Sequence, residues 1–247
     1  MASKNNKALG QHWLKNRAIL EEIAETAGEG GLCVEIGPGL GTLTSSLLKR
    51  FEKVIAVEFD KRLAENLPKS FPGKNLEVIN GDILGFDFEK LPEGYTVAGN
   101  IPYYITSPIL EKILRAKNRA RRVVLLVQKE VAERILDEKE TGLSLFVKNR
   151  ARVFRGPVVL KGEFTPPPKV DSEVIILEPK EPEVSEEVFG LIRKGFTAPR
   201  KKLIHNLSGL KSKEELLGIF QELEISADAR PSDLKLKDWK KLEKVIK

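Results

Sequence analysis

The residues with the most specific chemistry are Asn100, Ile101, Pro102 and Tyr103, which directly follow an apolar run that predicts a strand over 96–99. The amide oxygen of Asn100 and a backbone carbonyl of Ile101 or Pro102 can accept both hydrogens of an aromatic amino group, which draws the nitrogen lone pair out of the ring. Pro102 fixes the backbone that aims this carbonyl, and Tyr103 can stack on a base turned out of its helix. The pattern predicts methyl transfer to the amino nitrogen of adenine, in which alignment of the reacting atoms supplies most of the rate. A structural turn is the alternative for the same residues.

A glycine-rich turn and the ends of two further predicted strands indicate a site for the methyl donor. The GxGxG spacing of residues 37–41 differs from that of a dinucleotide-binding turn, and no phosphate-binding lysine follows it. Glu58 ends the next predicted strand, where a carboxylate can accept hydrogen bonds from both hydroxyls of a ribose. Asp82 can accept from the adenine amino group of the donor, and Ile83 can pack on its ring. Structural turns and helix caps are the alternatives. Taken together, the residues expected to hold S-adenosylmethionine are Gly37, Gly39, Glu58, Asp82, Ile83 and Asn100.

Alternating strands and helices would bring these residues to one edge of a sheet. Strands are predicted over 32–36, 53–58, 76–79, 96–99 and 122–127, and helices over 19–27, 41–50, 60–67, 108–115 and 130–138. This alternation predicts an α/β fold with a parallel sheet covered by helices on both faces. Ligands of such sheets bind at the carboxyl ends of the strands.

The pattern changes in the second half of the chain. Two strands are predicted over 153–160 and 173–177, on either side of a loop stiffened by three consecutive prolines. After residue 182 only helices are predicted, over 186–196, 201–207, 213–223 and 236–245. We therefore expect a catalytic domain at 1–182 and a small helical domain at 183–247.

Charge is distributed unevenly and favours a polyanionic partner. The net charge is +6, and residues 111–155 alone hold 13 Lys and Arg against 6 Asp and Glu. A second basic cluster, Arg200, Lys201 and Lys202, lies in the helical tail. Clustered positive charge of this kind suits RNA, with a solvated basic surface as the alternative. It argues against a methyltransferase of small molecules.

Composition excludes several other classes. The single cysteine, Cys33, excludes an intramolecular disulfide, and the two histidines are far apart, so we expect no metal site. No apolar run approaches the ~20 residues that span a bilayer, and the first residues do not read as a secretory signal. We expect a cytoplasmic monomer that does not bind membranes.

The chain resembles the KsgA-type small-subunit ribosomal RNA adenine dimethyltransferases, which are relatives of the Erm methylases of the large subunit. The resemblance covers nearly the whole chain and includes the glycine-rich turn and the strand ends described above. Its other motifs are Gly10-Gln11-His12-Trp13-Leu14, Val127-Gln128-Lys129-Glu130-Val131-Ala132, Pro166-Pro167-Pro168-Lys169-Val170-Asp171-Ser172 and Arg230-Pro231-Ser232-Asp233-Leu234.

The resemblance implies a Rossmann-like class I methyltransferase with a mostly parallel seven-stranded sheet and a small all-helical C-terminal domain. It implies transfer of four methyl groups to two adjacent adenosines in a hairpin near the 3′ end of small-subunit ribosomal RNA. By the same resemblance, His12 and Leu14 border S-adenosylmethionine and Phe164 forms a second face of the adenine site, although an ordinary core position is the alternative for Phe164.

The chain departs from the family pattern at three positions. His12-Trp13 replaces the usual Asn-Phe, which puts the His12 contact in question, and His205 replaces an arginine. An Erm-like methylase and a non-catalytic RNA-binding assembly factor are the alternative functions.

Overall fold

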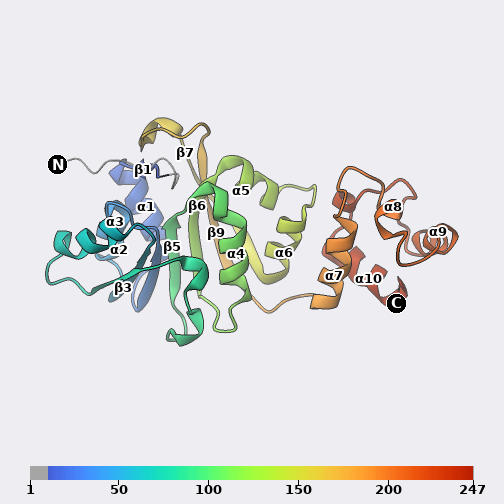
Figure 1. The fold of residues 1–247 in the computed structure, drawn as a ribbon, viewed down its shortest axis with the longest axis horizontal. Helices are drawn as coiled ribbons and strands as arrows, with labels where there is room; N and C mark the ends of the chain where they lie inside the picture. Colours follow the sequence, from blue (N-terminus) through green and yellow to red (C-terminus); the bar gives the residue numbers. More distant parts are fainter. Residues whose placement is uncertain (1–10, 247) are drawn as a thin grey trace. The chain divides into compact units, whose positions relative to one another are not determined.

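The computed structural model describes residues 11–246. Figure 1 shows the path of the chain through strands and helices. The strands are β1 (Trp13–Leu14), β2 (Leu32–Ile36), β3 (Lys53–Glu58), β4 (Leu76–Asn80), β5 (Thr96–Asn100), β6 (Arg122–Gln128), β7 (Ala151–Val159), β8 (Phe164–Thr165) and β9 (Ser172–Pro179). The helices are α1 (Arg17–Ala27), α2 (Thr42–Leu47), α3 (Lys61–Asn66), α4 (Thr106–Arg115), α5 (Lys129–Leu136), α6 (Gly142–Arg150), α7 (Glu186–Gly195), α8 (Leu203–Leu207), α9 (Lys213–Glu222) and α10 (Leu236–Ile246).

Within the described residues, seven strands form one sheet in the order β4-β3-β2-β5-β6-β9-β7. The pairs β3–β4, β2–β3, β2–β5 and β5–β6 are parallel, whereas β6 and β9 are antiparallel. Every residue of β2 is buried, as expected for a central strand covered on both faces. The predicted seven-stranded and mostly parallel sheet is therefore confirmed.

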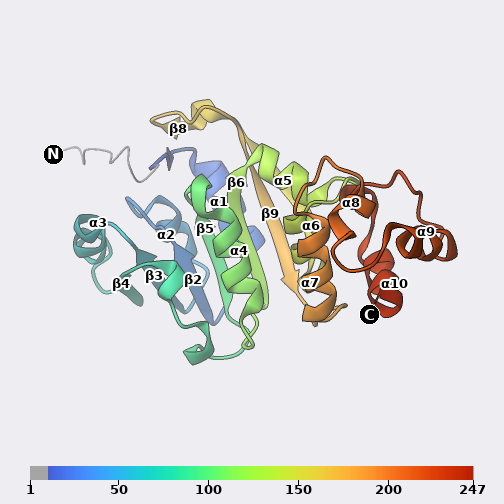
Figure 2. The same cartoon turned by 45° about the vertical axis from the view of Figure 1, so that its right-hand side comes forward.

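Helices cover both faces of this sheet because their apolar residues recur at helical spacing. In α1 the buried residues are Leu20, Ile23, Ala24 and Ala27, which lie on one stripe, and the Asn16 side chain caps the helix by accepting from the backbone N–H of Ala18. This stripe packs against β5 and β6. Figure 2 shows α4 across the opposite face of the same strands.

Two short strands far apart in sequence form a second, two-stranded sheet that the sequence did not predict. Trp13 of β1 pairs with Thr165 of β8, and Leu14 pairs with Phe164. Leu14 and Phe164 are both buried in the core that covers the sheet. This small sheet holds the segment around residue 12 against the loop that carries the three prolines.

The chain divides into two compact units, the sheet unit (residues 11–132 and 152–180) and the helical unit (residues 133–151 and 181–246). Residues 133–151, which we expected in the first domain, group with the C-terminal helices. One cause is Asn149, whose side chain accepts from the N–H of Val184 at 2.9 Å and donates to its carbonyl at 3.2 Å. Another is Glu140, which binds Lys148 at 3.0 Å and Lys235 at 3.3 Å.

The helical unit has its own core. Each of the four helices predicted after residue 182 is present as α7, α8, α9 or α10, with bounds that differ by at most two residues. Trp239 of α10 is fully buried and packs on Gly195, where an added Cβ would lie only 2.2 Å from the indole ring. None of the helices of the described chain is long and apolar enough to cross a membrane.

Candidate active site

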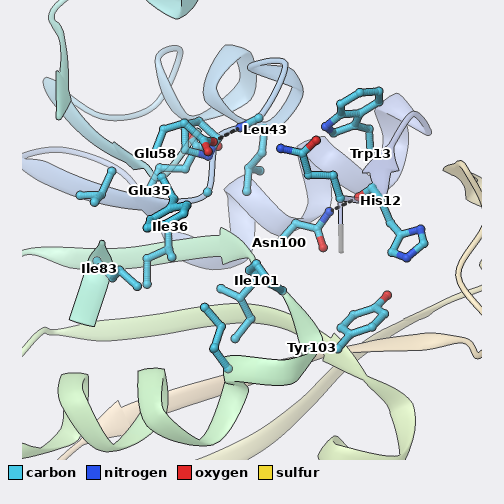
Figure 3. Close-up of a pocket in the computed structure, with 18 of the residues that line it drawn as sticks. His12, Trp13, Glu35, Ile36, Leu43, Glu58, Ile83, Asn100, Ile101 and Tyr103 are labelled. Atoms are coloured by element: carbon cyan, nitrogen blue, oxygen red, sulfur yellow. Dashed lines mark hydrogen bonds between the residues drawn. The ribbon is translucent and has the colours of Figure 1, made fainter. Parts of the chain in front are cut away.

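A cavity opens at the carboxyl ends of β2, β3 and β5, and Figure 3 shows the side chains that surround it. The structure brings together there all the predicted cofactor and catalytic residues. These are His12, Leu14, Gly37, Gly39, Glu58, Asp82, Ile83, Asn100, Ile101, Pro102 and Tyr103.

The glycine-rich turn follows β2 and forms one wall of the cavity. Gly37, Gly39 and Gly41 have φ angles of 64°, 59° and 80°, which a side chain would strain. The backbone N–H of Gly37 donates to the carbonyl of Val57 at 3.0 Å, which ties the turn to β3. An added Cβ on Gly39 would lie 3.2 Å from the indole ring of Trp13. A larger residue at position 39 would therefore displace Trp13 as well as narrow the cavity.

Glu58, at the end of β3, joins the turn to the strand. Its Oε2 accepts from the backbone N–H of Gly39 at 3.0 Å, and its Oε1 accepts from that of Asp60 at 2.8 Å. Burial raises the pKa of the Glu58 carboxyl, and these two N–H groups act in the opposite direction. Each carboxylate oxygen keeps a further acceptor position, so Glu58 can hold the turn and also accept from a ligand.

Ile83 begins the short 3-10 helix Ile83–Gly85 and lies at the far end of the cavity from Tyr103. Asp82 precedes it as the N-cap. The Oδ1 atom of Asp82 accepts from the backbone N–H of Leu84 at 2.9 Å. This cap fixes the carboxylate and leaves its second oxygen for a donor outside the chain. Ile83 is buried and presents an apolar surface to the cavity.

Asn100 ends β5, and one hydrogen bond orients its side chain. The Nδ2 atom donates to the backbone carbonyl of His12 at 2.9 Å, a contact drawn in Figure 3. A carbonyl oxygen can only accept, so the amide nitrogen must face His12 and Oδ1 must face away from it. The side chain therefore presents a fixed acceptor.

Tyr103 follows in a short 3-10 helix (Tyr103–Ile105) that starts after Pro102. Its hydroxyl lies 2.7 Å from the Oγ atom of Ser172, the first residue of β9, and burial raises the pKa of this hydroxyl. The ring is thus held from its far end, in the neutral form. The residue lines the cavity.

His12 turns its imidazole ring toward Tyr103. The two rings are nearly parallel, with centroids 6.0 Å apart and planes 17° apart. The Nδ1 atom of His12 lies 2.7 Å from the carbonyl of Pro166, so the proline loop fixes the ring. The contact of His12 with Asn100 is made by its backbone and does not depend on the side chain that stands there.

Several residues of the cavity wall were not predicted, among them Glu35 and Trp13. Glu35 of β2 is 1% exposed, and its Oε2 has no hydrogen-bond partner in the described part of the chain. Burial raises the pKa of the Glu35 carboxyl to about 8. Trp13 covers the glycine-rich turn, as described above. The available signal for Glu35 in the sequence is its position two residues before Gly37, inside the strand predicted over 32–36.

The expectation for Phe164 is corrected by the structure. Its side chain is 2% exposed in the core beside Leu14, and it does not line the cavity. Pairing of β8 with β1 directs this ring inward, so it cannot stack on a base in this conformation. The basic residues Arg200, Lys201 and Lys202 are exposed in the helical unit, where Lys202 forms an ion pair with Asp228.

Comparisons with known proteins agree with this geometry. Residues 2–247 match the family described as ribosomal RNA adenine dimethylase. A protein of Synechocystis sp. named "Ribosomal RNA small subunit methyltransferase A" is 37% identical over 100% of this chain and 98% of its own length. A protein of Gloeobacter violaceus with the same name is 39% identical over 96% of this chain and 91% of its own.

Two solved structures are similar over nearly the whole chain. A dimethyladenosine transferase from Plasmodium falciparum has a TM-score of 0.78 and 31% identity, covering 93% of this chain and 95% of its own. The 23S rRNA methyltransferase ErmE has a TM-score of 0.76 and 27% identity, covering 95% and 99%. A full-length family match and relatives above 30% identity lead to one conclusion: this chain belongs to the ribosomal RNA adenine dimethylase family of methyltransferases.

Proposed function

We propose that this protein transfers methyl groups from S-adenosylmethionine to the exocyclic amino nitrogen of two adjacent adenosines. The adenosines lie in a hairpin near the 3′ end of small-subunit ribosomal RNA, and the products are dimethyladenosines. The observation that carries this proposal is the orientation of Asn100, whose amide nitrogen is bound by the His12 carbonyl. Its Oδ1 is thereby fixed as an acceptor for an amino group.

The residues at the ends of β2, β3 and β4 fit S-adenosylmethionine. Glu58 is a buried carboxylate with acceptor positions to spare, Asp82 has one oxygen outside its cap, and Ile83 offers an apolar face. The glycine-rich turn leaves its backbone open to the cavity, because Gly37 and Gly39 line it and carry no side chain. When bound, this group supplies an electrophilic methyl on a sulfonium.

The chain's own contribution to catalysis is binding and orientation. Asn100 and the adjacent backbone carbonyl accept the two amino hydrogens, which reduces delocalisation of the nitrogen lone pair. Tyr103, held by Ser172, supports the base by stacking. No strong base is needed, because the amino group becomes acidic once it is alkylated.

RNA affinity in this proposal comes from basic residues outside the cavity. Contacts to phosphates supply most of the affinity of proteins for nucleic acids, and the basic stretch 111–155 together with Arg200, Lys201 and Lys202 is suited to them. We place the activity in the cytoplasm, where ribosomal subunits are assembled, and expect a monomer to suffice because one chain contains the whole cavity.

The decisive experiment maps methylated adenines in ribosomal RNA. Unmodified small and large subunits are incubated separately with the protein and S-adenosylmethionine, with Asn100→Ala as the control. We expect two adjacent dimethyladenosines near the 3′ end of the small-subunit RNA, formed much more slowly with the control. Methylation confined to the large subunit would favour the Erm-like alternative. Binding of either subunit without methylation would favour an assembly factor.

A further inference from the structure

The rim of the cavity holds the two most exposed large hydrophobic side chains of the described residues. Phe59 is 63% exposed and Tyr104 is 65% exposed, and both line this one cavity. Exposed apolar side chains scattered singly over a surface need no explanation. Phe59 and Tyr104, the two most exposed of these side chains, instead lie together at the mouth of one cavity. This placement indicates that bound ligands cover them.

The two aromatic residues belong to different sides of the mouth. Phe59 directly follows Glu58 and therefore lies with the residues proposed to bind the methyl donor. Tyr104 directly follows Tyr103 and lies with the residues proposed to bind the base. Tyr104 is therefore the aromatic side chain of the rim that an RNA strand would meet.

Local structure separates the directions of Tyr103 and Tyr104. Both belong to the 3-10 helix Tyr103–Ile105, in which successive side chains are about 120° apart. The hydroxyl of Thr106 donates to the carbonyl of Tyr103 at 3.1 Å and closes this turn. Tyr103 is consequently drawn inward to Ser172, while its neighbour is held at the surface.

We propose that Tyr104 is a stacking platform for the nucleotide next to the target adenosine. This inference rests on the proposed function and names a substrate contact that the function alone does not require. A base that enters the cavity leaves its neighbour at the mouth, with an unstacked face exposed to water. Tyr104 replaces the lost stacking partner. Tyr103 thus stacks on the target adenosine and Tyr104 on the adjacent nucleotide. RNA whose flanking base can stack on Tyr104 is the preferred substrate.

The direct test is fluorescence of 2-aminopurine placed at the 5′ or the 3′ neighbour of the target in a hairpin RNA. Stacking quenches this base. We expect wild-type protein to quench it at one of the two positions and Tyr104→Ala to leave it bright, while Tyr104→Phe behaves as wild type. Equal quenching by wild type and Tyr104→Ala at both positions would overturn the proposal. Because Tyr104 is 65% exposed, all these variants should unfold at the same temperature as wild type.

A kinetic cycle gives an independent readout. Tyr104→Ala should lower kcat/KM for RNA about tenfold, the order expected for one lost base stack, and leave the affinity for S-adenosylmethionine unchanged. For the wild type, kcat/KM should fall by the same factor when the flanking nucleotide of the RNA is abasic. For Tyr104→Ala, kcat/KM should be the same on abasic and intact RNA. If the reductions of kcat/KM caused by Tyr104→Ala and by the abasic site multiplied when the two changes were combined, Tyr104 and the flanking base would not be in contact.

Leu160→Ala is the control. Leu160 is an apolar residue directly after β7 that is similarly exposed, 59% accessible. It lies in the same unit, is not part of the cavity wall and is outside the basic stretch 111–155, so its truncation should leave every readout at the wild-type value. An inactive wild-type protein would refute the proposed function. An active wild type with an unresponsive Tyr104→Ala would refute only this inference.

Discussion

The two sides of the cavity are built in different ways. On the donor side, the glycine-rich turn, Glu58 and Asp82 are held by hydrogen bonds to backbone N–H groups at the ends of neighbouring parallel strands. On the acceptor side, Asn100 and Tyr103 are held by His12 and Ser172, which are 88 and 69 residues away in sequence. The side chains of the donor side are therefore positioned by backbone groups at neighbouring strand ends. The side chains of the acceptor side are positioned by segments that are distant in sequence.

This difference has a functional consequence. A donor site made by strand ends suits a ligand that every reaction of the family shares. An acceptor site that depends on the proline loop and on the segment around residue 12 can change with those segments while the donor site stays intact. Substitutions on the two sides should accordingly affect different quantities, donor affinity on one side and transfer rate on the other.

The largest effect is expected at Asn100. Asn100→Ala should lower the single-turnover rate on unmethylated RNA by about 100-fold, the order seen when one group that stabilises a transition state is removed. RNA affinity should be unchanged because phosphate contacts dominate it. Asn100→Asp keeps oxygen acceptors but cannot donate to the His12 carbonyl, so it should also be slow.

A premonomethylated RNA sharpens this prediction. Its amino group has one hydrogen left, so the side-chain and backbone acceptors cannot both be satisfied. The second transfer should therefore be less sensitive to Asn100→Ala than the first. Equal losses on both substrates would contradict the account with two acceptors, and full activity of Asn100→Ala would remove this residue from the site.

The next prediction concerns Glu35, on the donor side, and the dependence of the free energy of unfolding on pH. Glu35 has a pKa of about 8 in the folded protein, so between about pH 4.5 and pH 8 the folded state binds a proton that the unfolded state has released. The free energy of unfolding should fall as pH rises through this range, by a few kcal/mol at most. Glu35→Gln should abolish this part of the fall.

Urea titrations at pH 5, 7 and 9 would measure the free energy of unfolding, with Glu22→Gln, at an exposed residue of α1, as the control. A parallel pH dependence in wild type and Glu35→Gln would show that Glu35 is ionised in the folded protein.

The same contrast explains what could be predicted from sequence. Donor residues such as Glu58 end strands with a clear apolar pattern, so their meeting at one sheet edge followed from the alternation of elements. The pairing of β1 with β8 involves two residues on each strand, too few for any periodicity, so neither the inward turn of Phe164 nor the ring contact between His12 and Tyr103 could be foreseen. Helix α6 was missed for another reason: six of its nine residues are buried, which erases the alternation of polar and apolar faces.

On the donor side, Glu58→Ala should weaken the binding of S-adenosylmethionine by roughly 10- to 100-fold, because a charge-assisted hydrogen bond contributes about 1.5–3 kcal/mol. Glu58→Gln should also bind weakly, since an amide can accept from only one of the N–H groups of Gly39 and Asp60. Calorimetric titration would measure both. Asp60→Ala is the control: it removes the carboxylate that caps α3 outside the cavity, so it should cost stability and spare affinity. An unchanged dissociation constant for Glu58→Ala would place the ribose elsewhere.

The smallest effects separate stacking from positioning at Tyr103. Tyr103→Ala removes a face whose stacking on a base contributes about 1–3 kcal/mol, and it should slow methyl transfer roughly tenfold with donor affinity unchanged. Tyr103→Phe keeps the ring and loses only the hydrogen bond to Ser172, a contribution of about 1 kcal/mol, so it should retain most of its activity.

Ser172→Ala should match Tyr103→Phe, and the double variant should be no slower than either, because all three remove the same contact. Single-turnover rates for the four proteins would decide this. If Tyr103→Phe were as slow as Tyr103→Ala, the hydroxyl rather than the ring face would be the functional group. A donor affinity that fell in step with the rate would show that the two sides of the cavity are not independent.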